Sequence, residues 1–279
     1  MSEDVTSRKR VADLLIRHLG IAPLQPFYQG LLRLALLGMN VGGGTQKLQW
    51  SGEIRVMRYL KRVLASDGQD VVVFDVGAHS GKYAATVLSI FGATTRIHCF
   101  EPAHATCETL HQRFRDEPRV RIHELALGRQ AGRQALYTNP DRSGLASFFD
   151  GRFQLSGVEA TATEEVDVVR LDALCAEAGI ERIHFLKIDV EGADFDVLQG
   201  AGRMLAEGRI DAIQFEFGEC HLVSRTFFYD FFTLLNPEYQ LYRVLPRGLA
   251  PLPTYRTTYD IFVSGTNYLA ISRRLGAGP

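Results

Sequence analysis

VVVFDVGAHSGKY, at residues 71–83, carries the pattern from which the fold of this 279-residue chain can be inferred. Four apolar residues lead into Asp75, glycines follow at Gly77 and Gly81, and an amphipathic segment begins directly afterwards. This order is typical of a buried parallel strand that runs through a glycine turn into the N-terminus of a helix. Backbone N–H groups and the positive end of the helix dipole come together there, so we expect a ligand at this turn.

The spacing within the turn bears on which ligand binds. The run D-x-G-x-H-x-G lacks the second glycine of the G-x-G-x-x-G dinucleotide fingerprint. An acid at the strand end, with glycines two and six residues later, resembles the first motif of class I S-adenosylmethionine (SAM)-dependent methyltransferases. In that interpretation Asp75 lies near the amino-acid end of the cofactor. The alternative is an ordinary strand–helix turn that binds nothing.

A second acid ends the next predicted strand. RIHCFE at residues 96–101 ends in Glu101, and Pro102 then directs the chain out of the strand. Glu101 follows Gly81 by twenty residues, the spacing at which an acid at a strand end binds ribose hydroxyls in nucleotide-binding folds. We therefore predict that Glu101 binds a ribose, the alternative being an acid that faces solvent.

Strands and helices alternate along the rest of the chain, which indicates a parallel sheet covered by helices on both faces. Ligands of such sheets bind beyond the carboxyl ends of the strands. Several acids are predicted at those ends, which supports a site there. The further strands are expected at residues 120–127, 183–188, 210–217, 240–245 and 268–272, with 246–253 as a loop. Residues 128–163 show little pattern beyond a short strand at 135–137, but the apolar run at 143–149 is placed to line the pocket.

Composition excludes several classes of protein. The net charge of −1 lacks the basic excess of a nucleic-acid binder. The four cysteines form no C-x-x-C pair and are predicted to be buried thiols of a reducing compartment. No secretory signal is visible, and no apolar run near the start is long enough to span a bilayer. We therefore expect a cytoplasmic protein.

Residues 1–50 are predicted to form an N-terminal helical arm, with helices at 11–19 and 31–39 and a glycine-rich loop at 40–45. The arm is basic and amphipathic through residues 8–10, Arg17 and Arg33. We expect it to pack as a lid, the alternative being weak contact with a membrane surface or a lipid-linked substrate. Residues 51–279, which open with a helix predicted at 51–65, are expected to form the catalytic domain.

Longer motifs identify a family. Over residues 52–272 the chain resembles the FkbM family of SAM-dependent methyltransferases. The resemblance is carried by FDVGAHSGKY at 74–83, FEP at 100–102, LKIDVEGADFDVLQGA at 186–201, SRTFFYDFF at 224–232 and GTNYLAI at 265–271. One departure is His79, where family members usually have asparagine; both residue types tolerate left-handed backbone angles. The resemblance implies a Rossmann-like three-layer sandwich, with a mostly parallel seven-stranded sheet and an antiparallel C-terminal strand.

The resemblance also implies a reaction, namely methyl transfer from SAM to a hydroxyl of a sugar or natural product, with S-adenosylhomocysteine as the product. A hydroxyl is nearly neutral at pH 7, so its proton must be removed by a base or with the help of a metal. We predict Asp189 or Glu191 for positioning or proton removal and His221 as a rival base; a structural capping turn is the alternative for residues 189–192. The residues predicted to bind the cofactor are Asp75, Gly77, His79, Gly81, Tyr83, Glu101, Pro102, Leu125, Ala126 and Asp189.

A metal ion is not expected, but Asp189, Glu216 and Glu219 are the residues that would bind a divalent ion if one is used. The partner is predicted to be a small-molecule or saccharide acceptor. Two other functions are left open: a nicotinamide-dependent oxidoreductase on a Rossmann-like fold, and a non-catalytic SAM-binding protein. The sequence does not identify the acceptor or the oligomeric state.

Overall fold

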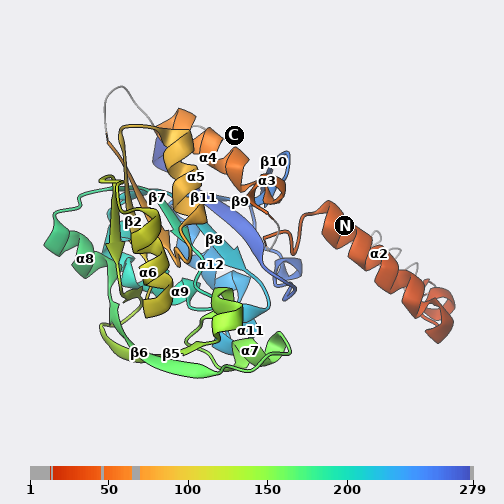
Figure 1. Cartoon of the computed structure of the whole chain (residues 1–279). Coiled ribbons are helices and arrows are strands. Elements are labelled where there is room, and N and C mark those ends of the chain that lie inside the picture. The colour runs from red at the N-terminus through yellow and green to blue at the C-terminus, as the bar shows by residue number, and fades with distance from the viewer. Residues whose placement is uncertain (1–12, 14, 45–46, 65–69, 277–279) are drawn as a thin grey trace. The chain divides into compact units, whose positions relative to one another are not determined.

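The computed structural model describes residues 13, 15–44, 47–64 and 70–276 (Figure 1). The chain divides into two compact units, Met1–Val41 and Gly42–Pro279. The predicted division at residue 50 into a lid and a catalytic domain stays a prediction. Residues 8–10, which carry most of the predicted basic charge of the arm, lie outside the described residues, as do residues 11, 12, 14 and 45.

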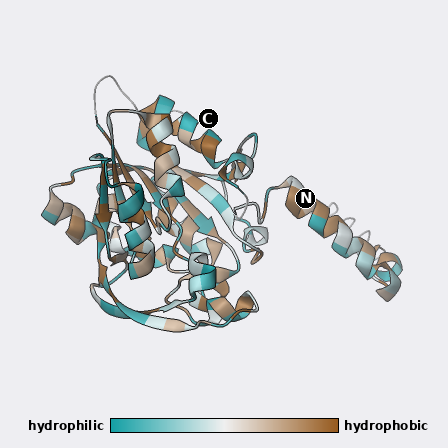
Figure 2. Ribbon diagram, in the orientation of Figure 1, coloured by the Kyte–Doolittle hydropathy of each residue, from teal (hydrophilic) through white to brown (hydrophobic). Residues whose placement is uncertain are grey.

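The first unit contains η1 (Ala22–Leu24) and the helix α2 (Gln25–Gly38). α2 is longer than the helix predicted at 31–39, because it begins at Gln25. Pro26 lies in the first turn, where its missing N–H has no partner to lose. The large apolar side chains of α2 include Phe27, Leu34 and Leu37, all of them exposed. Figure 2 shows that hydrophobic and hydrophilic residues are mixed along this helix. Among the described residues, no helix is long and apolar enough to span a membrane.

The second unit is built on one eight-stranded sheet. Its strand order is β10 (Gly248–Pro251), β9 (Tyr239–Leu245), β11 (Thr266–Ser272), β8 (Ile210–Phe217), β7 (Ile183–Ile188), β1 (Val71–Val76), β2 (Thr95–Phe100) and β3 (Val120–His123). The strands from β3 to β8 pair in parallel, whereas β11 is antiparallel to both β8 and β9. The predicted fold class is therefore confirmed.

The sheet has one strand more than predicted. β10 comes from the segment at 246–253 that we expected to be a loop, and it pairs antiparallel with β9. Pro251 is compatible with this strand because it is the last residue of β10, on the outermost strand of the sheet, where a missing N–H costs little.

Helices cover both faces of the sheet, as the predicted three-layer sandwich requires (Figure 1). Side chains alternate between the faces, so Val73 packs with one set of helices and Phe74 with the other. The Val73 face is covered by α4 (Glu53–Leu64), α5 (Lys82–Phe91) and part of α6 (His104–Arg113), and the Phe74 face by α8 (Leu171–Ala178), α9 (Asp194–Gly200), α10 (Gly202–Ala206) and α12 (Phe228–Leu235). The helix predicted at 51–65 is instead α3 (Leu48–Ser51) followed by α4, because Gly52 between them has a φ of 99°.

A second, three-stranded sheet lies where the sequence showed little pattern. It has the order β4 (Ala126–Leu127), β6 (Ala162–Val169) and β5 (Gly132–Thr138). The strand predicted at 120–127 is thus divided between the two sheets as β3 and β4. We did not predict β6, although its alternation is visible in hindsight, since Val166 and Val168 are buried and Asp167 between them is exposed. The short helices η2 (Pro140–Leu145) and α7 (Gly151–Leu155) connect β5 to β6.

Candidate functional site

The turn after β1 joins the carboxyl ends of three strands. Gly77, His79 and Gly81 have positive φ angles of 81°, 47° and 72°. The N–H of Gly77 donates to the carbonyl of Phe100 at the end of β2, over 3.0 Å. A Cβ on residue 77 would lie 1.9 Å from the carbonyl oxygen of Asp189, beyond β7, so only glycine fits there.

Glu101 is held in place by the same turn. Its Oε2 accepts a hydrogen bond from the N–H of His79 (2.9 Å), and its Oε1 accepts one from Ala103 (3.1 Å). Burial raises the pKa of Glu101 to about 7, and the two backbone bonds oppose that rise. Each carboxylate oxygen can accept a further hydrogen bond, so Glu101 has capacity left for a ligand hydroxyl.

Glu101 lines a cavity of about 250 Å³, called here the first cavity. Its walls come from the ends of β1, β2 and β7 and from the loop after β3. Residues 143–149 also contribute, as expected, and Ser143 Oγ lies 2.9 Å from His79 Nε2. The predicted site residues that line it are Gly77, His79, Glu101, Pro102, Leu125, Ala126, Asp189 and Glu191. Their roles as ligands of a cofactor stay predictions.

Three residues predicted to bind the cofactor do not line the first cavity. Gly81 packs against α6, since a Cβ there would lie 2.5 Å from the ring of Phe114. Asp75 is fully buried and faces Lys187, whose Nζ is 3.7 Å from Asp75 Oδ1. These two residues are register partners in β1 and β7, so their side chains point to the same face of the sheet. Asp75 thus does not line this cavity, and its predicted place near the amino-acid end of the cofactor stays a prediction. The third, Tyr83, is considered below.

Lys187 is the centre of a buried charge network. Its ammonium donates to Asp189 Oδ2 over 3.1 Å and lies 5.2 Å from the ring centre of Tyr83. Burial lowers the pKa of Lys187, but the surrounding carboxylates outweigh this and hold it above its usual value, so the side chain stays a cation. Burial also raises the pKa of Asp75 to about 6, although Lys187 opposes this.

Asp189 belongs to a second cavity as well, of about 550 Å³. The two cavities share Gly77, His79 and Asp189 in their walls. Several of the other residues that line the second cavity have polar side chains, and they come from the segment before α3 and from α3, α4, α5, β7 and β11. They include Lys47, Gln49, Glu53, Tyr83, Lys187 and Asn267.

Gln214 connects the polar groups beneath this second cavity. Its amide nitrogen donates to Glu53 Oε1 (2.9 Å) and to Asn267 Oδ1 (3.3 Å), and its oxygen accepts from the hydroxyl of Tyr83 (3.1 Å). We did not predict Glu53, Gln214 or Asn267 as site residues. The signal available was a polar residue inside two apolar strands, IDAIQFEF and TNYLAIS.

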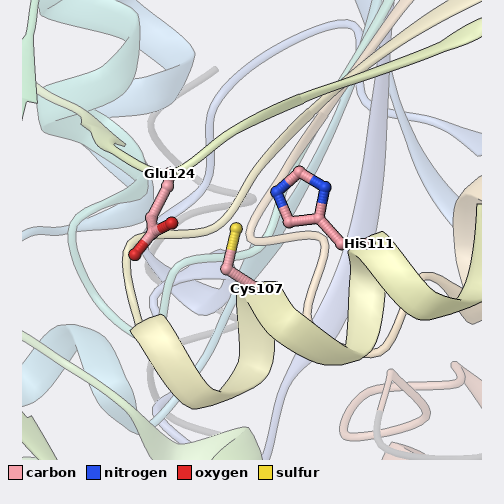
Figure 3. Close-up of side chains that lie close together, drawn as sticks. All are labelled: Cys107, His111 and Glu124. Carbon is pink, nitrogen blue, oxygen red and sulfur yellow. The ribbon is translucent and has the colours of Figure 1, made fainter. Parts of the chain in front are cut away.

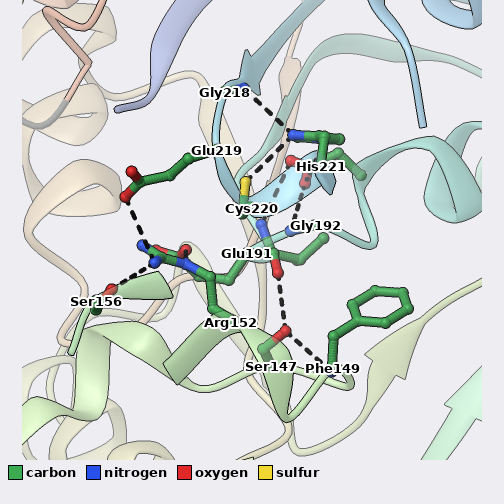
Figure 4. A network of polar contacts seen from close by, with 12 residues as sticks. Ser147, Phe149, Arg152, Ser156, Glu191, Gly192, Gly218, Glu219, Cys220 and His221 are labelled. Atoms are coloured by element: carbon green, nitrogen blue, oxygen red, sulfur yellow. Dashed lines mark hydrogen bonds and ion pairs between the residues drawn. The ribbon is translucent and has the colours of Figure 1, made fainter. Parts of the chain in front are cut away.

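Glu191 is engaged by an arginine that we did not predict (Figure 4). Its Oε2 accepts from Arg152 Nε over 2.6 Å, and Arg152 Nη1 also lies 3.6 Å from Glu219. Burial raises the pKa of Glu191, and Arg152 opposes the rise. The carbonyl of Glu191 accepts from Ser147 Oγ over 2.8 Å, which ties the segment at 143–149 to the end of β7. The backbone of Glu191 thus contacts this segment, and its carboxylate pairs with Arg152.

His221 does not face either cavity in the described part of the chain. It is fully buried, its Nε2 lies 3.4 Å from Asp194 Oδ2, and its Nδ1 accepts from the N–H of Gly218 (3.3 Å). The aromatic rings of Phe217 and Phe231 pack around it. His221 therefore lines neither cavity, and its role as a rival base stays a prediction.

The conditional divalent-ion site is not assembled either. The carboxylate oxygens of Asp189, Glu216 and Glu219 do not all come within 4.8 Å of one another in the part of the chain that the structure describes. Burial raises the pKa of Glu216 well above its usual value, and Glu219 faces Arg152.

Comparison with known proteins gives a family match over more than half of the chain. The model described as "Methyltransferase FkbM domain" matches residues 75–244. The chain is 25% identical over 208 residues to the 2-O-methyltransferase NoeI of Sinorhizobium fredii (strain NBRC 101917 / NGR234), a match that covers 71% of this chain and 84% of NoeI. It is 31% identical over 154 residues to the 31-O-demethyl-FK506 methyltransferase FkbM of Streptomyces tacrolimicus, covering 46% of this chain and 58% of that protein.

Among solved structures, a methyltransferase FkbM from Methylobacillus flagellatus KT aligns with a TM-score of 0.44 at 17% identity. The alignment covers 81% of this chain and 63% of that one.

The Lys187 network predicts a large cost for removing its cation. Lys187→Met leaves Asp75 buried without its counterion, so we expect a loss of about 3–5 kcal/mol in the free energy of unfolding, measured by urea denaturation. Adding Asp75→Asn should restore part of that loss because the uncompensated charge is then removed. Lys61→Met, a change at an exposed position of α4, is the matched control. Equal stability of the Lys187→Met and Lys61→Met variants would contradict this account of the network.

The raised pKa of Glu101 predicts that the stability of the fold depends on pH. Its pKa is about 7 in the folded chain against a usual 4.5, so the folded state binds the proton more tightly than the unfolded state. Protonation of Glu101 therefore contributes to the free energy of unfolding. This contribution is fully present below pH 4.5 and is lost as the pH rises through 7, by on the order of 3 kcal/mol. We expect the free energy of unfolding to fall less between pH 5 and 8 in Glu101→Gln than in the wild type or the exposed control Glu165→Gln. Parallel pH profiles of all three would refute the assignment.

Proposed function

The chain belongs to the FkbM methyltransferase family, and from this premise we propose that it transfers the methyl group of SAM to a hydroxyl oxygen of a sugar or natural-product acceptor. The observation that carries the proposal is the pair of cavities that share Asp189. One contains a buried carboxylate with capacity for hydroxyl donors, and the other presents several charged and amide side chains. A cofactor and a hydroxylated acceptor could thus meet at one side chain.

The first cavity fits SAM by its chemistry. Glu101 would accept hydrogen bonds from the ribose hydroxyls, since both of its oxygens keep a free lone pair. Leu125 and Ala126 offer an apolar surface for the adenine, and the backbone of the Gly77 turn approaches closely enough to contact the ligand. When bound, SAM supplies a methyl group on a sulfonium, which is already a strong electrophile.

The second cavity is proposed to bind the acceptor. Its amide and charged side chains, among them Gln49, Glu53 and Asn267, can donate to and accept from several hydroxyls at once. Such side chains fit the hydroxyls of a polyhydroxylated acceptor. NoeI and FkbM, by their names, methylate oxygen atoms, which supports the same class of acceptor atom for this chain.

Asp189 is proposed as the group that orients the acceptor hydroxyl and receives its proton. It lies in the walls of both cavities, and its side chain is 39% exposed. A carboxylate is a weak base toward a free hydroxyl, so proton transfer would accompany formation of the carbon–oxygen bond. Lys187 fixes the position of one carboxylate oxygen and leaves the other for the hydroxyl. Of the three residues first considered, Glu191 faces Arg152 and His221 is buried, so Asp189 is the one that remains.

Cofactor binding is tested first, by calorimetry with SAM and with NADH. We expect SAM to bind one per chain and NADH not to bind. Glu101→Gln should weaken SAM binding by roughly 1–3 kcal/mol, because a carboxylate that accepts two ribose hydroxyls becomes an amide that can accept only through one atom. Glu165→Gln, at an exposed position of β6, should bind as the wild type does. Unchanged affinity in Glu101→Gln would remove its role, and binding of NADH alone would refute the proposed cofactor.

Methyl transfer is tested by release of S-adenosylhomocysteine with a panel of monosaccharides, short oligosaccharides and macrolides. With the best acceptor of the panel, Asp189→Asn should lower kcat by about 10²–10⁴-fold and change SAM affinity little. The matched control is Asp167→Asn, which replaces an exposed aspartate of β6. A fully active Asp189→Asn variant would exclude Asp189 as the base. SAM binding without release of product on any acceptor would favour a non-catalytic role.

A further inference from the structure

Three side chains with metal-binding atoms converge outside both cavities. They are Cys107 and His111 of α6 and Glu124, which follows β3 (Figure 3). The thiol sulfur of Cys107, a ring nitrogen of His111 and a carboxylate oxygen of Glu124 all lie within 4.8 Å of one another. Within the described residues, no other group of three His, Cys, Asp or Glu side chains meets this criterion.

The local structure explains why the three converge. Cys107 and His111 are four residues apart in a regular helix, which places both side chains on one face. Figure 3 shows both pointing from that helix toward Glu124, which comes from a separate segment. A site built from two segments distant in sequence depends on the tertiary fold, unlike a chance pair within one helix.

Sulfur, imidazole nitrogen and carboxylate oxygen together are a ligand set of the zinc type. Magnesium and calcium prefer oxygen alone, so the thiol argues against either ion. We propose that Cys107, His111 and Glu124 bind one Zn²⁺ ion, with a water molecule at the fourth position. Zinc bonds of about 2.0–2.3 Å would draw the three ligand atoms to within roughly 4 Å of one another. His111 and Glu124 are exposed and Cys107 is buried, so the two exposed side chains can make this small movement.

A neighbouring histidine supports Glu124 as a ligand. His104 Nδ1 lies 2.6 Å from Glu124 Oε1, at hydrogen-bond distance, so this contact orients the carboxylate. Metal-binding carboxylates commonly have such a partner, which fixes their direction before the ion arrives. The other oxygen, Oε2, is not used in this contact. His104 acts here as a positioning residue.

The place of the site in the fold suggests what the ion would do. α6 begins at His104, shortly after Glu101 and Pro102, and Glu124 directly precedes Leu125 and Ala126. All four of these neighbours line the first cavity, namely Glu101, Pro102, Leu125 and Ala126. An ion that joins α6 to Glu124 would therefore hold together two segments that flank this cavity. The proposed ion would bridge these two segments, and its binding does not depend on the proposed methyl transfer.

The test is a titration of the untagged, full-length, metal-free protein with Co²⁺, a spectroscopic substitute for zinc. We expect saturation at one ion per chain, a thiolate-to-cobalt charge-transfer band, and loss of that band when Zn²⁺ is added. Cys107→Ser should abolish the band. His111→Ala and Glu124→Gln should each weaken binding by about tenfold or more. Zn²⁺ should also raise the Tm of the wild type but not that of His111→Ala.

Two control variants separate this site from other thiols and acids. Cys175→Ser removes a different buried thiol, and Glu108→Gln removes an exposed carboxylate of α6 outside the group; both should keep the band. The absence of a saturable band in the wild type, or its survival in Cys107→Ser, would overturn the proposal. Wild-type Co²⁺ affinity in both His111→Ala and Glu124→Gln would also overturn it, and these two changes alter only exposed side chains. None of these readouts depends on methyltransferase activity.

Discussion

One buried ammonium group organises the centre of this protein. Lys187 sits beneath the surface between Asp75 and Asp189 and close to the ring of Tyr83. A lysine in this position is tolerable only because carboxylates surround it, and the buried Asp75 is in turn tolerable only because of the lysine. The requirement fixes the register of β1 against β7, since a shift of one residue would point Asp75 to the opposite face. The glycine turn and the end of β7 are consequently held at one edge of the sheet.

Two cavities follow from that arrangement. The first opens between the ends of β1, β2 and β7, and residues 143–149 form part of its wall. The second lies on the α3–α4 side of the same turn. Asp189 lines both cavities because it directly follows β7, at the edge of the sheet where the two cavities adjoin. The buried lysine thus supports the side chain that we propose for chemistry.

Sequence patterns predicted the parallel sheet well because buried strands are continuous apolar runs, and β7 and β8 have the bounds expected for them. The same patterns predicted fewer of the strands that are only partly buried. β6 and β10 were missed, and the strand expected at 120–127 proved to belong to two sheets. In the site, Glu101 and Ala126 line a cavity as expected, whereas Asp75 and His221 do not. A position at the end of a strand can be inferred from sequence, but the direction of a side chain depends on which neighbour it packs against.

The sequence by itself determined that strands and helices alternate, that acids gather where strands end, and that the chain resembles one family of methyltransferases. These properties depend on local pattern, on apolar periodicity and on motifs. Only the tertiary structure decided that Asp75 faces Lys187, that Arg152 engages Glu191, and that Asn267 and Glu53 share a cavity with Asp189. Each of these contacts joins residues from different strands, helices or loops. Partners of that kind are selected by the packing of the whole sheet and its helices, which no short stretch of sequence specifies.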